Sequence, residues 1–173
     1  MQGLVPALAG LASVALLDDP EAAQGFIDRA LQAGASLDHS HALVVAARIR
    51  LAAGDPEGAV KYAEQAALEA EAQRDDAELA QVYEVLAEAR GDRSLAQDAL
   101  ELWRELLNPV GAPRATLLLA RLEADPVRSL RLAEMASREA AELGAREIVT
   151  AAQTLIGQLE EHQPESDIAI TCL

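Results

Sequence analysis

Few residues of this 173-residue chain are of types that could carry out chemistry, and their spacing does not favour it. The segment "DHSH" places His39 and His41 two residues apart, which puts the two imidazoles on different faces of a helix. Asp38 or Ser40 in the same segment is better suited to capping that helix. The sequence shows no Ser/His/Asp set, glycine-rich phosphate loop or zinc-ligand spacing. We therefore expect no enzymatic activity, no cofactor and no metal site.

The composition favours an all-α protein. Hydrophobic residues make up 51% of the chain but aromatic residues only 2%, so the apolar content is mostly Ala, Leu, Val and Ile. Alanine and leucine are strong helix formers, and small side chains allow helices to approach closely. Classes rich in β-structure are poorly supported.

The charge limits the kinds of partner. The net charge of −15 repels phosphate backbones, so we expect no direct contact with nucleic acid. The 14 basic residues are scattered among 29 acidic ones, so no patch for an anionic membrane is expected. The single cysteine, Cys172, is compatible with a reducing cytoplasm. The apolar opening "MQGLVPALAGLASVALL" lacks a positively charged start, and we interpret it as a buried first helix rather than a signal peptide or membrane span.

The stretch "LAAGDPEGAV" predicts a tight corner between two helices. Gly54 can close one helix in the left-handed conformation, Asp55 can cap the next helix, and Pro56 suits its first position. Similar corners recur at Asp19, Asp92 and Asp125, so successive corners are separated by 36, 37 and 33 residues. Two helices per period of this length are typical of a helical solenoid. The predicted helices span about 2–17, 20–34, 39–53, 56–73, 76–90, 93–107, 113–124, 126–143 and 146–162.

This pattern resembles the tetratricopeptide repeat family over about residues 1–162. The family places small residues seven apart in the second helix of each repeat; the corresponding pairs here are Ala23 and Ala30, Ala59 and Ala66, Ala96 and Trp103, and Ser129 and Ala136. The family's glycine is present as Gly54 and Gly91, but its large aromatics in the first helix are mostly missing. The resemblance implies a right-handed superhelix of antiparallel helix pairs with about nine helices: four pairs and a capping helix. We expect Trp103 to be a core residue.

In a repeat of this kind the first helices line the concave face. The residues predicted on that face, and hence the candidate ligand- or partner-binding residues, are His41, Arg48, Glu78, Gln81, Glu88, Arg114 and Arg121. The three arginines could together hold a carboxylate, a phosphate or an acidic peptide. Alternatively, they form surface salt bridges with Glu78, Glu88 and Glu123.

The tail differs from the rest of the chain. Pro164 prevents a simple continuation of the last helix, and "DIAITCL" alternates and contains β-branched residues, as a strand does. "IAITCL" resembles the first strand of the winged-helix DNA-binding domain in SARP-type bacterial transcriptional activators. Residues 163–173 are thus predicted to be a disordered linker and the first strand of a further domain.

Together these features resemble the helical repeat domain of a large SARP-type or LuxR-type bacterial transcriptional activator. The resemblance implies a cytoplasmic sensor, oligomerisation or protein-interaction domain that binds a protein, a peptide or a small-molecule effector. The alternative is a free-standing adaptor that binds a peptide or protein partner. A homodimer through the apolar N-terminal helix is a further hypothesis.

Overall fold

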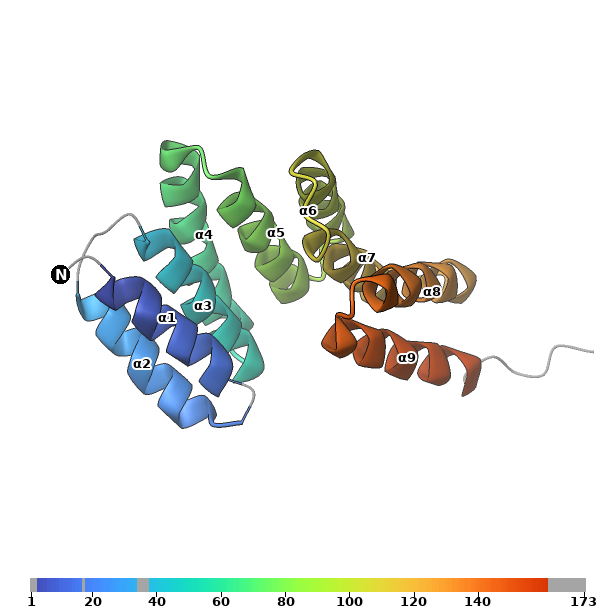
Figure 1. Cartoon of the computed structure of the whole chain (residues 1–173), viewed down its shortest axis with the longest axis horizontal. Coiled ribbons are helices and arrows are strands. Elements are labelled where there is room, and N and C mark those ends of the chain that lie inside the picture. Colours follow the sequence, from blue (N-terminus) through green and yellow to red (C-terminus); the bar gives the residue numbers. More distant parts are fainter. Residues whose placement is uncertain (1–2, 17, 34–37, 162–173) are drawn as a thin grey trace, which may run out of the picture. The chain divides into compact units, whose positions relative to one another are not determined.

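The computed structural model describes residues 3–16, 18–33 and 38–161, and all regular structure within these ranges is helical (Figure 1). Nine helices lie in the described part of the chain: α1 (Leu4–Ala15), α2 (Pro20–Gln32), α3 (His39–Ala52), α4 (Pro56–Gln73), α5 (Asp76–Arg90), α6 (Arg93–Glu105), α7 (Gly111–Leu122), α8 (Pro126–Glu142) and α9 (Arg146–Glu161). Helix ends differ from the predicted ones by at most two residues. Helices that follow one another pack in pairs, which confirms the prediction of an all-α, solenoid-like fold.

The chain divides after Asn108 into two compact units. The first contains α1 to α6 and the second contains α7 to α9. The helical domain predicted over residues 1–162 covers both units, and the predicted tail strand lies outside the described residues.

The helices of the first unit form two layers. The odd-numbered helices contact one another in turn, α1 with α3 and α3 with α5, whereas no two even-numbered helices of this unit are in contact. Closer spacing on one side of a stack bends it toward that side, so α1, α3 and α5 form the inner layer. Their side chains that point away from the even helices form the inner face of the unit.

Aspartate caps set the corners, as predicted. The side chains of Asp19, Asp55 and Asp92 accept hydrogen bonds from the backbone N–H groups of Ala22, Gly58 and Ser94 at 3.0, 2.8 and 2.9 Å. In the second unit Asp125 does the same for α8. These bonds satisfy donors that the first turn of a helix would leave free.

Left-handed residues close the preceding helices. Gly54 has φ = 73°, and the next backbone N–H, that of Asp55, donates to the Arg50 carbonyl at 2.9 Å. The same closure occurs after α4 and α6 without glycine, because Arg74 and Leu107 have φ values of 56° and 52°. Side chains disfavour this conformation, so these two ends are closed at some cost in backbone energy.

Alanine dominates the buried side of the outer helices. Ala59 and Ala66 are fully buried in α4, and so are Ala63 and Ala70 between and beyond them. The equivalent positions of the other helices are buried too, namely Ala23, Ala30, Ala96, Trp103, Ser129 and Ala136. The predicted small-residue pattern is therefore the side on which each outer helix packs.

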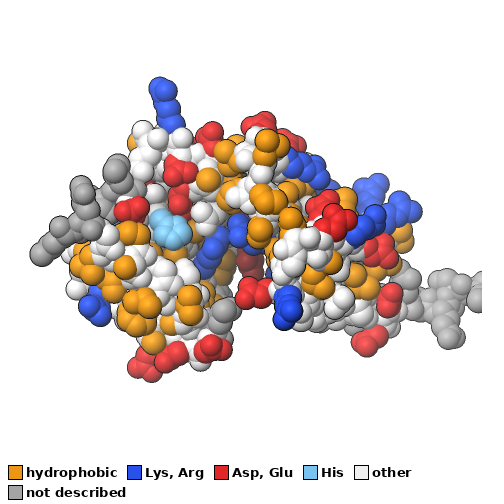
Figure 2. Space-filling model, in the orientation of Figure 1, with side chains coloured by type: hydrophobic (Ala, Val, Ile, Leu, Met, Phe, Trp, Pro, Cys, Tyr) orange, Lys and Arg blue, Asp and Glu red, His pale blue; other side chains and the backbone are white. Residues whose placement is uncertain are grey.

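One side of α1 is buried and the other is not. Val5, Leu8, Ala9 and Ala12 belong to the core, whereas large side chains on the opposite side are exposed: Leu4 at 45%, Leu11 at 51% and Val14 at 70%. Figure 2 shows hydrophobic side chains gathered on the surface over α1. The first helix is thus only half buried, and dimerisation through it stays a prediction.

The second unit packs three helices around its own small core. Leu117 of α7, Ala136 of α8 and Ala152 of α9 are buried together. The Ser129 hydroxyl donates to the Ala120 carbonyl at 2.7 Å, which ties the start of α8 to the end of α7.

Replacement of Ala66 by leucine should overpack α4 against its neighbours. We expect a loss of about 1–3 kcal/mol in the free energy of unfolding, measured by urea denaturation. The control is Ala72→Leu, at an exposed position of the same helix, where we expect a change within about 0.5 kcal/mol. Equal effects of the two variants would contradict close packing at Ala66.

Candidate functional site

The inner face of the first unit carries a polar cluster between α3 and α5. His41 and Arg48 lie seven residues apart on α3, hence on one side of that helix, and α5 presents acidic and amide side chains toward them. The structure brings four of the predicted residues into direct contact, as the pairs His41–Glu78 and Arg48–Gln81. We refer to His41, Arg48, Glu78, Gln81 and Glu84 as the inner-face cluster.

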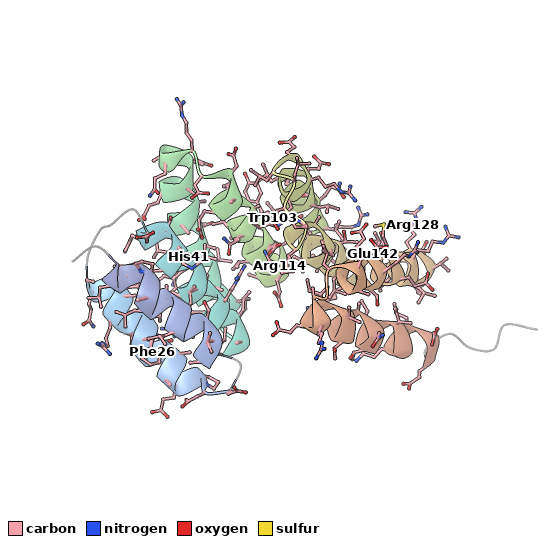
Figure 3. All side chains as sticks on the ribbon, viewed as in Figure 1. Phe26, His41, Trp103, Arg114, Arg128 and Glu142 are labelled. Carbon is pink, nitrogen blue, oxygen red and sulfur yellow. The ribbon has the colours of Figure 1, made fainter. Side chains whose placement is uncertain are left out.

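Glu78 is the most constrained member of the cluster. Only 9% of its side chain is exposed, and its Oε2 lies 3.4 Å from Nδ1 of His41, whose side chain is 38% exposed. Figure 3 labels His41 on α3. The other oxygen, Oε1, is buried and has no hydrogen-bond partner. A buried polar atom without a partner costs free energy and is uncommon in folded proteins.

The same contact sets the charge of the imidazole. The hydrogen bond and charge of Glu78 raise the pKa of His41 above 6.5, against the opposing effects of burial and of the Arg48 guanidinium. Asp38 adds a smaller effect in the same direction as Glu78. The contact with Glu78 therefore favours the protonated form of the His41 imidazole.

Arg48 contacts two other members of the cluster, Gln81 and Glu84. Its Nη2 donates to Oε1 of Gln81 at 3.3 Å and lies 3.6 Å from Oε2 of Glu84. The Trp103 indole, on α6, donates from Nε1 to Oε1 of Glu84 at 2.7 Å. This buried carboxylate thus connects three helices, α3, α5 and α6.

The sequence analysis missed Glu84. Trp103 was correctly predicted to be a core residue, with 3% of its surface exposed. A buried indole N–H needs an acceptor, and a search of the facing helix for one would have found this glutamate. Arg48 forms a salt bridge with Glu84, which is not among the partners expected for the three arginines, namely Glu78, Glu88 and Glu123.

Three predicted site residues remain, namely Glu88, Arg114 and Arg121. Glu88 is exposed near the end of α5. Arg114 and Arg121 belong to α7 of the second unit, where Arg114 is half-buried and Arg121 is exposed. Their grouping with Arg48 on one concave face stays a prediction.

The two neighbouring histidines face different helices, as their spacing indicates. Nδ1 of His39 lies 2.9 Å from Oε2 of Glu69 on α4, whereas His41 turns to α5. Of the two, only His41 belongs to the inner-face cluster.

The His41–Glu78 pair should make stability depend on pH. A raised folded-state pKa means that the folded chain binds the proton more tightly, so the stabilisation is complete below about pH 6.5 and is lost as pH rises through the folded pKa. We expect the free energy of unfolding to fall over that range in the native chain, and to fall less in His41→Gln.

An NMR titration tests the cause directly. The variants His39→Gln and His41→Gln assign the two imidazole signals, and that of His41 should titrate above 6.5. A His41 pKa at or below that value would show that Glu78 does not hold the proton.

The indole bond of Trp103 should contribute to stability beyond ring packing. Trp103→Phe removes the donor but keeps an aromatic ring, and we expect a loss of about 1–3 kcal/mol. A double-mutant cycle with Glu84→Met, which removes both acceptor oxygens, should give a coupling energy of about 0.5–3 kcal/mol, whereas additive effects would exclude an energetically significant bond.

Metal clusters and membrane-spanning helices are both absent from the part of the chain that the structure describes. No group of three or more His, Cys, Asp or Glu side chains among them could hold a metal ion. None of the described helices has the length and apolarity needed to cross a membrane. No protein-family model and no curated protein sequence matches the chain.

Proposed function

We propose that the chain is a ligand- or partner-binding domain of a bacterial transcriptional regulator, and that the inner face of the α1–α6 unit receives the ligand or partner. The proposal extends the resemblance to SARP-type and LuxR-type activators described above. Contacts with DNA would be made by another part of the regulator, because a net charge of −15 opposes them here.

The observation that carries the proposal is the inner-face cluster. Two carboxylates, Glu78 and Glu84, are each more than nine-tenths buried, and one oxygen of Glu78 lacks a partner. A fold that needed only a stable core would gain from apolar residues at these positions. Local departures from full hydrogen bonding are found mostly at functional or strained sites.

The cluster contains both basic and acidic side chains that a ligand could contact. Arg48 keeps 34% of its side chain exposed, and His41 keeps 38%, so an acidic group could reach both side chains from the solvent side. Such a ligand would add charge-assisted hydrogen bonds to those that already orient the guanidinium. Carboxylates, phosphates and acidic peptides are therefore the first ligand classes to test.

Binding would act by shifting the balance between arrangements of the helix stack. A ligand that contacts α3 and α5 together favours the arrangement in which the two helices are at their bound spacing. Because these helices belong to the inner layer, the curvature of the unit would respond.

A thermal-shift screen against metabolites, nucleotides and short acidic peptides tests the proposal. A ligand present at 100 times its Kd should stabilise the chain by about 2.7 kcal/mol, or roughly 5–10 °C in Tm. Arg48→Ala should remove most of this shift.

The matched control is Arg50→Ala. Arg50 lies on the same helix and has a similarly exposed side chain, at 37%, but it pairs with Asp55 instead of the cluster. A ligand shift that survives Arg48→Ala, or that both variants reduce equally, would place binding elsewhere. If no compound shifts Tm, the inner face is not a small-ligand site, and a macromolecular partner becomes the remaining form of the proposal.

A further inference from the structure

A second surface of the first unit, which shares no residue with the inner-face cluster, carries two hollows lined by residues of α5, of α6 and of the turn from α4 into α5. The two hollows follow one another along this helix pair, with volumes of about 500 and 240 Å³. The larger lies where α5 begins, beside Leu106, and the smaller lies one to two turns further on, beside Tyr83. We refer to the two hollows together as the α5–α6 groove.

We refer to the four large apolar side chains of the lining, those of Leu79, Tyr83, Leu102 and Leu106, as the floor of the groove. Leu79 and Tyr83 lie four residues apart on α5, and Leu102 of α6 lies four residues before Leu106, the residue that ends this helix. Residues four apart form a ridge on a helix surface, and the space between two such ridges accepts a ridge of a third helix. Leu106 leaves 41% of its surface exposed, so this side of the pair has apolar area still to bury.

The rim of the groove is acidic. The carboxylates among its lining residues are Asp75, Asp76, Asp98, Glu101 and Glu105, and among the described residues that line it Arg74 is the only cation. Asp75 is already used, because it caps α5 by accepting from the Glu78 N–H at 2.9 Å. Most of the remaining negative charge lies on exposed side chains of α6.

The acidic groups around the groove affect the pKa of Tyr83 on its floor. Partial burial raises the pKa of the Tyr83 hydroxyl, and the nearby charges of Asp98 on α6 and Glu71 on α4 raise it further. Tyr83 thus lies between acidic groups of both outer helices. An aromatic ring in such a field is a favourable place for a cationic side chain with an aliphatic stem.

We propose that the α5–α6 groove docks a short basic amphipathic helix of a partner protein, with aliphatic anchors on the floor and lysines or arginines along the acidic rim. The rise of a helix fixes the size of the docked segment. From Asp76 to Tyr83 the groove follows α5 for about 10 Å, or two helical turns, which two or three anchors at positions i, i+3 or i+4 and i+7 would span. This surface and the inner face can be tested independently, because no lining residue of the groove belongs to the inner-face cluster.

A fluorescence-anisotropy titration of the whole chain tests the proposal. The probe is a labelled amphipathic peptide of leucine and lysine with helical spacing. A peptide of the same composition with the order scrambled and one with glutamate in place of lysine serve as comparisons. We expect the helical Leu/Lys peptide to bind at least tenfold more tightly than either comparison. Equal binding of the scrambled peptide would overturn the helix-docking proposal.

Three exposed residues of the rim give the decisive variant. Asp98→Asn, Glu101→Gln and Glu105→Gln combined should weaken binding about tenfold. The control combines Glu21→Gln, Asp28→Asn and Glu57→Gln, which make the same change in net charge at exposed positions on α2 and α4. Equal loss in both triple variants would mean that the probe responds only to the overall negative charge, and would refute the groove.

Tyr83→Ala tests the floor without changing the charge. It should weaken binding of the helical peptide at least fivefold while the circular-dichroism helix signal is retained. If Tyr83→Ala lowers the helix signal, Tyr83→Phe keeps the ring and should bind like the native chain. Undiminished binding by a folded Tyr83→Ala chain, or loss of binding in a folded Tyr83→Phe chain, would contradict an apolar floor.

Discussion

Helix packing in this molecule depends on the small side chains at the buried positions of the outer helices. In α4 the buried positions 59, 63, 66 and 70 are all alanine, so neighbouring backbones can approach without interlocking long side chains. Each such contact buries little area, and stability must therefore accumulate along the whole length of the helices. The exception is α6, where Trp103 occupies the position of a small residue and needs Glu84 as a hydrogen-bond acceptor.

The features that could be predicted are those encoded locally. The capping aspartates and the glycine closure at Gly54 are recognisable because each acts within a few residues of the chain. Alanines at a spacing of seven identify the packed side of a helix for a similar reason, since the helix period alone determines which residues share a face. The helix ends were therefore predictable to within two residues.

The features that escaped prediction depend on contacts between distant residues. Glu84 appears in the sequence as one more acid of an acidic protein, and only the fold places it between Arg48 and Trp103. The left-handed Arg74 and Leu107 carry no glycine to mark them, because their conformation is imposed by the helix that each one closes. Of the inner-face cluster, the sequence pattern identified His41, Arg48, Glu78 and Gln81, but it identified neither Glu84 nor the pairs that these residues form.

A single helix carries both of the surfaces discussed above. On one side of α5, Glu78, Gln81 and Glu84 belong to the inner-face cluster; on the other, Leu79 and Tyr83 form part of the groove floor. A ligand that displaces α5 by binding at one surface would change the affinity of the other surface for its own ligand. Thermodynamic linkage then requires the influence to be mutual: whatever factor the first ligand applies to the affinity of the second, the second applies to the first. Because α5 contributes residues to both surfaces, a shift of this one helix would be enough to couple two binding events.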